Sequence, residues 1–271
     1  MRVTIADICC EFQGLEKEPL GEAVAMRYSA FLSDDPPRIT ARVRVRPPIM
    51  GALPKADEPV ITIDETSENH FEILRLDNPF EATLDVGHGR AEVVVNDNLY
   101  CFDSFLRIIY SILLADGDGL LLHSAAVASS DQAVLLVGVS EAGKTTLCSL
   151  GFPTVLSDEL VAVRRSGDEF VAYSTPFWGE FVAGRVLERR PVGGIYLLRK
   201  GPQHEVRPAQ LSSALFEILG CVFFFGPKRL TPAVLDRAGD LVEANLRGEF
   251  YFKPTADVVA FLDKEVEQYV A

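Results

Sequence analysis

Residues 133–146 are the part of the sequence that most constrains the fold. They read AVLLVGVSEAGKTT, five apolar residues followed by the spacing G-x-x-x-x-G-K-T, which starts at Gly138. The apolar run has the length and branching of a buried strand, and residues 144–150 are expected to form the first turns of a helix. A strand, a glycine-containing loop and a helix in this order predict a phosphate-binding loop. A Gly-Lys turn that arose by chance explains the context less well.

The glycines of this loop have a conformational role. Gly138 and Gly143 permit backbone angles that a side chain would hinder, so the N–H groups of the loop can turn toward phosphate oxygens. Ser140 and Ala142 lie between them and are expected to contribute backbone contacts. The N-terminus of the following helix adds positive potential.

The residues that end the motif supply charge and a metal ligand. Lys144 is expected to reach the β- and γ-phosphates of a nucleoside triphosphate, and Thr145 offers a hydroxyl suited to Mg²⁺. Thr146 either bonds a phosphate or packs against the protein. ATP and Mg²⁺ are therefore the expected ligands, although a loop of this kind can also bind a nucleotide without catalysing a reaction.

Composition argues against several classes of partner. The chain has 271 residues, 48% of them hydrophobic, and a formal net charge of -13. Because nucleic acids are held by clustered lysine and arginine, this charge argues against a nucleic-acid partner. The five cysteines, at positions 9, 10, 101, 148 and 221, have no C-x-x-C spacing and predict free thiols in a reducing compartment. No signal peptide or apolar segment long enough for a membrane span is evident, so we expect a cytoplasmic protein without a membrane partner.

Residues 1–98 form a β-rich N-terminal region in this interpretation. Short alternating segments separated by turn residues predict its strands. These strands are expected at residues 23–31, 39–45, 60–64, 70–74, 82–86 and 91–95.

Residues 99–271 are expected to form the nucleotide-binding domain. It begins with a helix over 99–114, where apolar residues recur at helical spacing. A buried strand over 120–128 and its hairpin partner at 133–137 then precede the loop. Two consecutive strands before a phosphate loop predict a mixed sheet of an α/β (α+β) domain. Further strands are expected at 154–156, 160–164, 169–173 and 194–198, and helices at 211–225 and 233–245.

Carboxylates beyond the loop are candidates for acid–base chemistry. Asp158 and Glu159 follow a strand-like segment, and phosphoryl transfer needs a group that accepts the proton of the attacking hydroxyl. Successive side chains of a strand point to opposite faces, so one of the two is expected to face the phosphates unless the chain turns here. Asp158 is the preferred base, and a turn-forming Ser-Asp pair is the alternative. Glu159 is then either a metal ligand by way of water or a solvated neighbour. His123, in an otherwise apolar strand, is either a core residue or a neighbour of Asp158.

Three segments together resemble a known family. Residues 122–127, 137–146 and 156–160 are similar to the HPr kinase/phosphorylase family, whose P-loop kinase domain resembles phosphoenolpyruvate carboxykinase. The resemblance implies that Thr145 binds magnesium, that Asp158 is the acid–base catalyst with His123 close to it, and that Glu159 supports the site. It also implies a metal-binding role for Glu180. One departure is Glu141, because the family usually has glycine at this position.

The leading hypothesis is therefore a kinase that transfers the γ-phosphoryl group of ATP to a hydroxyl of a protein, a peptide or a small molecule. A nucleotide sensor without catalysis is the second hypothesis. The third is a small-molecule phosphotransferase of carboxykinase type, for which Arg185, Arg189 and Arg190 would bind an acidic substrate unless they form a solvated helix face. In the first hypothesis the β-rich region positions the acceptor or mediates assembly into a homo-oligomer.

Overall fold

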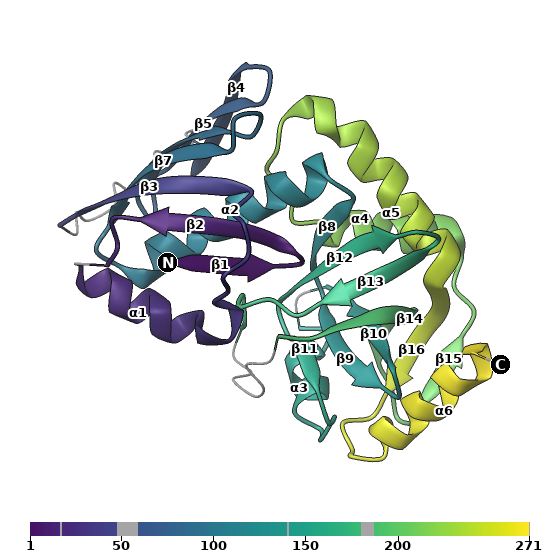
Figure 1. Ribbon diagram of the computed structural model, residues 1–271. Helices are drawn as coiled ribbons and strands as arrows, with labels where there is room; N and C mark the ends of the chain where they lie inside the picture. Colours follow the sequence, from purple (N-terminus) through teal and green to yellow (C-terminus); the bar gives the residue numbers. More distant parts are fainter. Residues whose placement is uncertain (17, 48–58, 140, 180–186, 271) are drawn as a thin grey trace. The chain divides into compact units, whose positions relative to one another are not determined.

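The computed structural model describes residues 1–16, 18–47, 59–139, 141–179 and 187–270. It is a mixed α/β structure (Figure 1). Its internal contacts divide the chain into two compact units, Met1–Leu113 with Phe225–Arg229, and Leu114–Phe224 with Leu230–Ala271. The division lies inside helix α2 (Leu99–Asp116), beyond the boundary at residue 98 expected from the sequence. No helix in the described ranges is long and apolar enough to cross a membrane.

The first unit contains a seven-stranded sheet with the order β1-β2-β3-β7-β6-β5-β4. Strand β3 runs parallel to both β2 and β7, and the remaining pairs are antiparallel. The strands are β1 (Arg2–Ile5), β2 (Ile8–Gln13), β3 (Ile39–Arg46), β4 (Ile61–Ser67), β5 (His70–Arg75), β6 (Phe80–Asp85) and β7 (Arg90–Asn96).

Helix α2 packs its aromatic side chains on one face of this sheet. The Phe102 ring lies 5.2 Å from that of Phe12 on β2, and the Phe105 ring lies 5.7 Å from that of Phe80 on β6, both edge to face. Such pairs contribute about 0.5–1.5 kcal/mol beyond the area that they bury. This packing explains why most of α2 belongs to the first unit.

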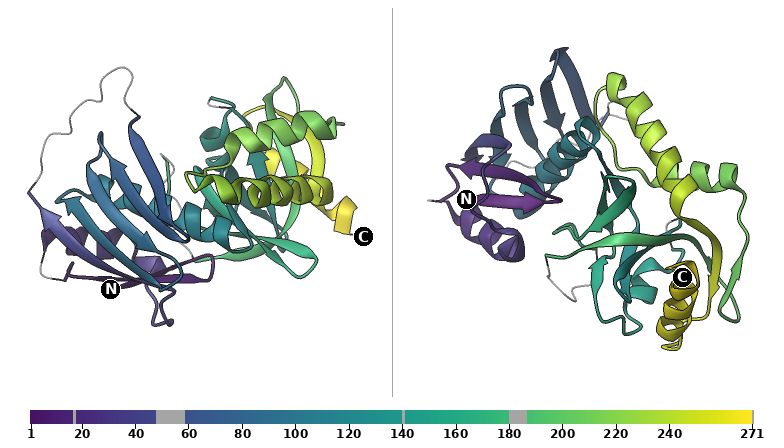
Figure 2. Two further views of the ribbon diagram at one scale, coloured as in Figure 1. Left: turned by 90° about the horizontal axis from the view of Figure 1, so that it is seen from above. Right: turned by 45° about the vertical axis from the view of Figure 1, so that its right-hand side comes forward.

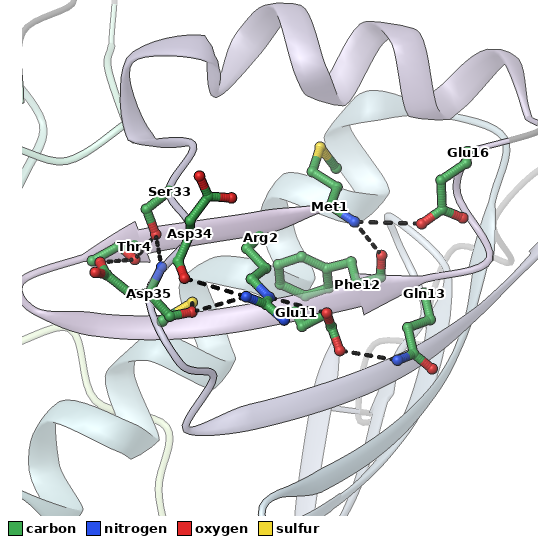
Figure 3. Close-up of polar contacts among 11 residues, drawn as sticks. Met1, Arg2, Thr4, Glu11, Phe12, Gln13, Glu16, Ser33, Asp34 and Asp35 are labelled. Atoms are coloured by element: carbon green, nitrogen blue, oxygen red, sulfur yellow. Dashed lines mark hydrogen bonds and ion pairs between the residues drawn. The ribbon is translucent and has the colours of Figure 1, made fainter.

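Polar contacts hold the first hairpin against the segment that follows residue 32 (Figure 3). Arg2 binds Glu11 across the β1–β2 pair, and the Thr4 hydroxyl lies 2.6 Å from that of Ser33 and donates to Asp35. These contacts attach residues 33–35 to the edge strand β1.

The prediction of a strand at residues 23–31 is wrong. These residues belong to helix α1 (Pro19–Arg27) and the short 3-10 helix η1 (Ser29–Phe31). Leu20, Val24 and Tyr28 are buried at a spacing of four residues, which places them on one face of a helix. Proline in the first helical turn is also typical of a helix start.

The second unit contains a nine-stranded sheet. The sheet is mixed, as the sequence predicts. Strand β14 runs parallel to β10 and to β16, whereas β9 and β10 form the expected antiparallel hairpin. The path is β11-β9-β10-β14-β13-β12-β8, and β16 pairs with both β14 and β15. The strands are β8 (Gly119–His123), β9 (Ala125–Ser129), β10 (Gln132–Val137), β11 (Val155–Ser157), β12 (Leu160–Ser166), β13 (Glu169–Tyr173), β14 (Arg189–Lys200), β15 (Glu205–Arg207) and β16 (Leu246–Phe252).

The single strand expected at residues 120–128 is in fact two. The chain breaks at Ser124, whose hydroxyl donates to the carbonyls of Ala125 and Leu136. The break sends β8 to pair with β12 and β9 to pair with β10.

Helices cover both faces of the second sheet (Figure 2). On β10, Leu135 and Val137 point to the cluster that includes α4 and α5, and Val134 and Leu136 point to the cluster that includes α3 and α6. The alternation leaves β10 buried on both faces of the sheet. The helices of this unit are α3 (Lys144–Cys148), α4 (Leu211–Cys221), the 3-10 helix η2 (Lys228–Leu230, which straddles the division), α5 (Thr231–Asn245) and α6 (Val258–Val270).

Candidate functional site

The glycine loop joins the carboxyl end of β10 to the start of α3. Gly143 has a φ of 101°, in the left-handed region that favours glycine. At Gly138, an added Cβ would lie 2.8 Å from the Cβ of Ala142, which is closer than such atoms approach. Both positions therefore require glycine for the loop to take this shape. Ser140, the expected backbone contact between them, lies outside the described residues.

Helix α3 is shorter than the sequence suggests. It spans only Lys144–Cys148, whereas helical turns were expected to continue to residue 150. A helix of five residues aligns few peptide dipoles, so it adds little to the potential at the loop. Charge for anion binding must come from side chains and from the N–H groups of the loop itself.

Lys144 lies folded over the loop. Its ammonium group donates to the carbonyl oxygen of Gly138 at 2.7 Å and to that of Val139 at 3.3 Å. The side chain is buried, with 8% of its surface exposed, and burial lowers the pKa of Lys144. A buried ammonium that donates to neutral carbonyls would gain electrostatic energy from a phosphate, because burial weakens the competition of water.

A cavity of about 370 Å³ opens over this loop. It brings together most of the site residues predicted from the sequence, although the loop positions Gly138 and Ala142 do not line it. Its lining consists of His123, Glu141, Gly143, Lys144, Thr145, Thr146, Asp158, Glu159, Gly179 and Lys200.

Asp158 and Glu159 both line the cavity because the chain bends between β11 and β12. The strand geometry that would allow only one of them to face the loop therefore does not apply. Asp158 is 4% exposed, and its Oδ1 accepts the backbone N–H of Gly179 at 2.9 Å. This bond orients the carboxyl group at the wall of the cavity.

His123 reaches the cavity through strand pairing. It is the last residue of β8 and pairs with Leu160, the first residue of β12, so it lies next to the Asp158–Glu159 bend. The side chain is exposed, which argues against the alternative of a core histidine. Its strand, β8, is not the hairpin partner of β10.

The negative charge of Asp158 affects the pKa of a neighbouring thiol, that of Cys148. Burial raises the pKa of Cys148 to about 12, and the charge of Asp158 adds to the shift. All five cysteines are free thiols, as predicted. Cys148 is therefore protonated at neutral pH and serves as a small apolar side chain of α3.

Magnesium would find few protein ligands here, which suits its preference for phosphate and water oxygens. The Thr145 hydroxyl and the Glu159 carboxylate line the same cavity and fit this requirement. The described residues contain no cluster of three or more His, Cys, Asp or Glu that could hold a metal alone. Glu180, the other expected metal ligand, lies outside the described residues.

Lys200 is a cavity residue that the sequence analysis does not identify. It ends β14, which runs parallel to β10 from Ala133 to Val137, so both strands deliver their carboxyl ends to the same edge of the sheet. Ligands of open α/β sheets bind at this edge. A basic pair directly after an apolar strand was the signal that could have revealed Lys200.

The two described arginines of the carboxykinase hypothesis, Arg189 and Arg190, are not brought to the loop. Arg189 and Arg190 begin a strand, β14, and not a solvated helix face. Arg190 donates to Glu188 and to the carbonyl oxygen of Ser130, and neither arginine is among the described residues that line the cavity. Arg185 lies outside the described residues.

Comparison with known proteins adds little to this geometry. No protein-family model matches the chain, and no curated protein matches it. One solved structure, the Hpr(Ser) kinase/phosphatase from Coxiella burnetii, is similar over 43% of this chain and 92% of its own, with 13% sequence identity and a TM-score of 0.25. A likeness at this level does not allow residues or activity to be carried over, so a function must be argued from the site.

Proposed function

We propose that this chain is an ATP-dependent phosphotransferase whose second unit is a P-loop kinase domain of the HPr kinase and phosphoenolpyruvate carboxykinase type. One observation carries the proposal: Lys144, which is suited to bind phosphates, and Asp158, which is suited to accept a proton, line one cavity. Neither feature alone would distinguish an enzyme from a nucleotide-binding protein.

Several residues of the cavity have a task in this proposal. The loop N–H groups and Lys144 bind the phosphates, and Thr145 and Glu159 would hold Mg²⁺, which would supply positive charge to the phosphate oxygens. Asp158 accepts the proton of the acceptor hydroxyl while the hydroxyl oxygen attacks the γ-phosphorus. The bond from that phosphorus to the β,γ-bridging oxygen breaks, and ADP leaves with the electron pair. His123 lies where it can hold the acceptor or orient Asp158.

Nucleotide sensing is the second candidate function, because a phosphate loop can bind a nucleotide without catalysing a reaction. Glu141 lines the cavity, where its carboxylate would repel a triphosphate and weaken the binding that both functions need.

The Asp158→Asn variant separates the two functions. Purified protein is incubated with γ-labelled ATP and Mg²⁺, with and without cell extract, and labelled products are counted. We expect turnover to fall by about 10²- to 10⁴-fold, the range for general acid–base groups, while nucleotide binding persists. Asp168→Asn, at an exposed turn, is the matched control and should leave turnover unchanged. Equal turnover of Asp158→Asn and the wild type would refute the assigned base, and nucleotide binding without turnover in either protein would favour the sensor.

A further inference from the structure

Residues 175–179, which we call the anchor segment, lead from the end of β13 to the wall of the cavity. The register of β12 and β13, continued by two residues, places Thr175 opposite Leu160, which follows Asp158 by two residues in the chain. At its other end the segment contributes Gly179 to the lining of the cavity. Both ends of the anchor segment therefore lie close to the proposed base.

The Thr175 hydroxyl fixes the start of the anchor segment. Thr175 is fully buried, and its hydroxyl donates to the carbonyl oxygen of Leu160 and accepts the N–H of Phe177 at 3.3 Å. The N–H of Leu160 donates in turn to the carbonyl oxygen of Phe177 at 3.4 Å. Pro176 has no N–H of its own, so it cannot serve as the donor to Leu160 if the hydroxyl is removed. This buried side chain thus ties the segment to the strand that begins just after the base.

Gly179 places the other end of the anchor segment against the carboxylate. Its N–H donates to Oδ1 of Asp158 at 2.9 Å, and a Cβ at this position would lie 2.9 Å from Oδ2 of the same group. The φ of Gly179 lies outside the left-handed region, so the backbone alone would tolerate alanine. Because Asp158 is buried, its carboxylate has little space into which it could retreat. The contact between the two residues is therefore the reason for glycine here.

We propose that Thr175 is a positioning residue of the phosphotransferase site. Through the anchor segment and the Gly179 N–H, it holds the Asp158 carboxylate where that group can accept the proton of the acceptor hydroxyl. A bond from an N–H to a carboxylate is charge-assisted and fixes the direction of the group. The inference rests on the proposed function, because it takes Asp158 as the base. It adds a buried residue that does not line the cavity.

Thr175→Val keeps the shape of the side chain and removes its hydroxyl. At saturating ATP, turnover of γ-labelled ATP with Mg²⁺ and cell extract should fall by about 10- to 100-fold, since a misplacement of about 1 Å can cost about 10²-fold in rate. The affinity for an ATP analogue, measured by calorimetry, should not change, and Thr175→Ser should restore most of the rate. Ser129→Ala is the control, because it removes a buried hydroxyl that donates to Asp263 at 2.6 Å outside the cavity, and it should leave turnover unchanged.

Gly179→Ala tests the other end of the anchor segment. The added methyl group should displace the carboxylate and lower turnover while the Thr175 hydroxyl stays in place. Gly239→Ala, in α5, is the control and should have no effect, because an added Cβ there would meet no atom within 4 Å.

A double variant shows whether Thr175 acts through Asp158. In Asp158→Asn the base is absent, so the addition of Thr175→Val should cause no further loss of turnover. An equal fold-loss in the wild-type and Asp158→Asn backgrounds would give Thr175 a merely structural role and would overturn the inference.

The contact is also measured without turnover. Protein labelled with ¹⁵N-glycine gives NMR signals from its 20 glycines, and Gly179→Ala identifies the signal of Gly179. The Gly179 amide should exchange with solvent roughly 10-fold faster in Thr175→Val than in the wild type, the factor for a weakened hydrogen bond to a charged group. Unchanged exchange, or unchanged turnover in an active protein, would overturn the inference and leave the proposed function standing. A wild type without turnover would refute the proposed function and, with it, the base that Thr175 is inferred to position.

Discussion

Glu141 has a backbone conformation that favours glycine. Its φ of 67° lies in the left-handed region, where a side chain costs roughly 1–2 kcal/mol. Its carboxylate also lines the cavity above the phosphate loop. This residue therefore combines backbone strain with a charge that opposes the ligand the loop is suited to bind.

We expect Glu141→Gly to bind an ATP analogue more tightly than the wild type. A like charge at ~5 Å from a phosphate costs roughly 0.8–3 kcal/mol for effective dielectric constants between those of water and a protein surface. Isothermal titration calorimetry should show the gain, and the gain should shrink as salt is added.

Glu141→Gln is the matched variant, because it removes the charge and keeps the strained backbone. The difference in affinity between the glutamine and wild-type proteins measures repulsion, and the difference between the glycine and glutamine proteins measures how far the strain of the loop changes on binding. Weaker binding in both variants would show that Glu141 is itself a ligand of the metal–nucleotide complex.

Lys144→Ala should abolish most nucleotide binding and leave the fold intact. The pKa of Lys144 is lowered by burial, and a bound phosphate would raise it again, so binding takes up a proton above the free-site pKa. The affinity of the wild type should therefore fall as the pH rises through the lowered pKa of Lys144 in the free site, whereas the residual affinity of the variant should change much less. Calorimetry at several pH values measures both effects, and undiminished affinity in the variant would refute the phosphate loop.

At the scale of elements, β14 presents two basic residues to opposite faces of the sheet. Arg199 pairs with Glu217 of α4 and with Glu249 of β16. Lys200, one residue later, points to the other face, beyond Leu198, and lines the cavity. One cation is thus committed to structure, and the other is available to a ligand.

Lys200→Ala is expected to weaken binding of an ATP analogue by about 3- to 30-fold, since a partly exposed cation contributes modestly to each phosphate contact. Lys200→Arg should restore part of the affinity because it keeps the charge. Lys253→Ala, which removes an exposed lysine just after β16, is the control. Equal effects at positions 200 and 253 would mean that the lysines act only through the net charge of the protein.

The sequence predicts some elements better than others for identifiable reasons. Strands β3, β5, β6 and β7 alternate between buried and exposed residues, so their period of two is visible. The break at Ser124 is not recognised, because the apolar residues on either side of His123 and Ser124 have the pattern of a single buried strand. Nothing in the sequence analysis assigned β16 or α6, whose apolar residues pack against strands distant in sequence.

The residues of the site also differ in how well the sequence predicts them. The loop is predictable because its residues are adjacent in the chain and each has a local role. The approach of His123 and Lys200 depends on strand pairing, and only the structure reveals that β8 lies beside β12 and that β14 lies beside β10. Pairing of this kind leaves no local signal in a single sequence.

At the scale of the molecule, each unit has its own buried interior. In the first unit the Tyr28 hydroxyl donates to Asp103 at 2.7 Å, and Arg107 donates to the other oxygen of the same carboxylate at 2.7 Å. Asp103 thus joins α2 to the end of α1. Burial and the charge of Asp103 raise the pKa of Tyr28 well above its ordinary value, so the hydroxyl remains a donor.

Asp103→Ala should destabilise the first unit by about 2–5 kcal/mol, because it leaves a buried hydroxyl and a half-buried guanidinium without their acceptor. Native-state hydrogen exchange should show faster exchange in peptides from Met1–Leu113 and little change in peptides from Leu114–Phe224. Tyr28→Phe, which removes only one donor, should have a smaller effect in the same peptides. An equal increase throughout the chain would show that the two units unfold as one.

Strand β14 also has an irregularity with a consequence for the whole second unit. Gly193 is an extra residue against β10, because Ala133 pairs with Val192 and Val134 pairs with Gly194. The residues that follow, Ile195 to Leu198, are apolar on both faces and would be buried equally well if displaced by one position. The bulge therefore sets the register in which the rest of β14 pairs with β10. Without it, Arg199 would take the place of Lys200 at the phosphate loop, and Leu198 would take the place of Arg199 beside the carboxylates of α4 and β16.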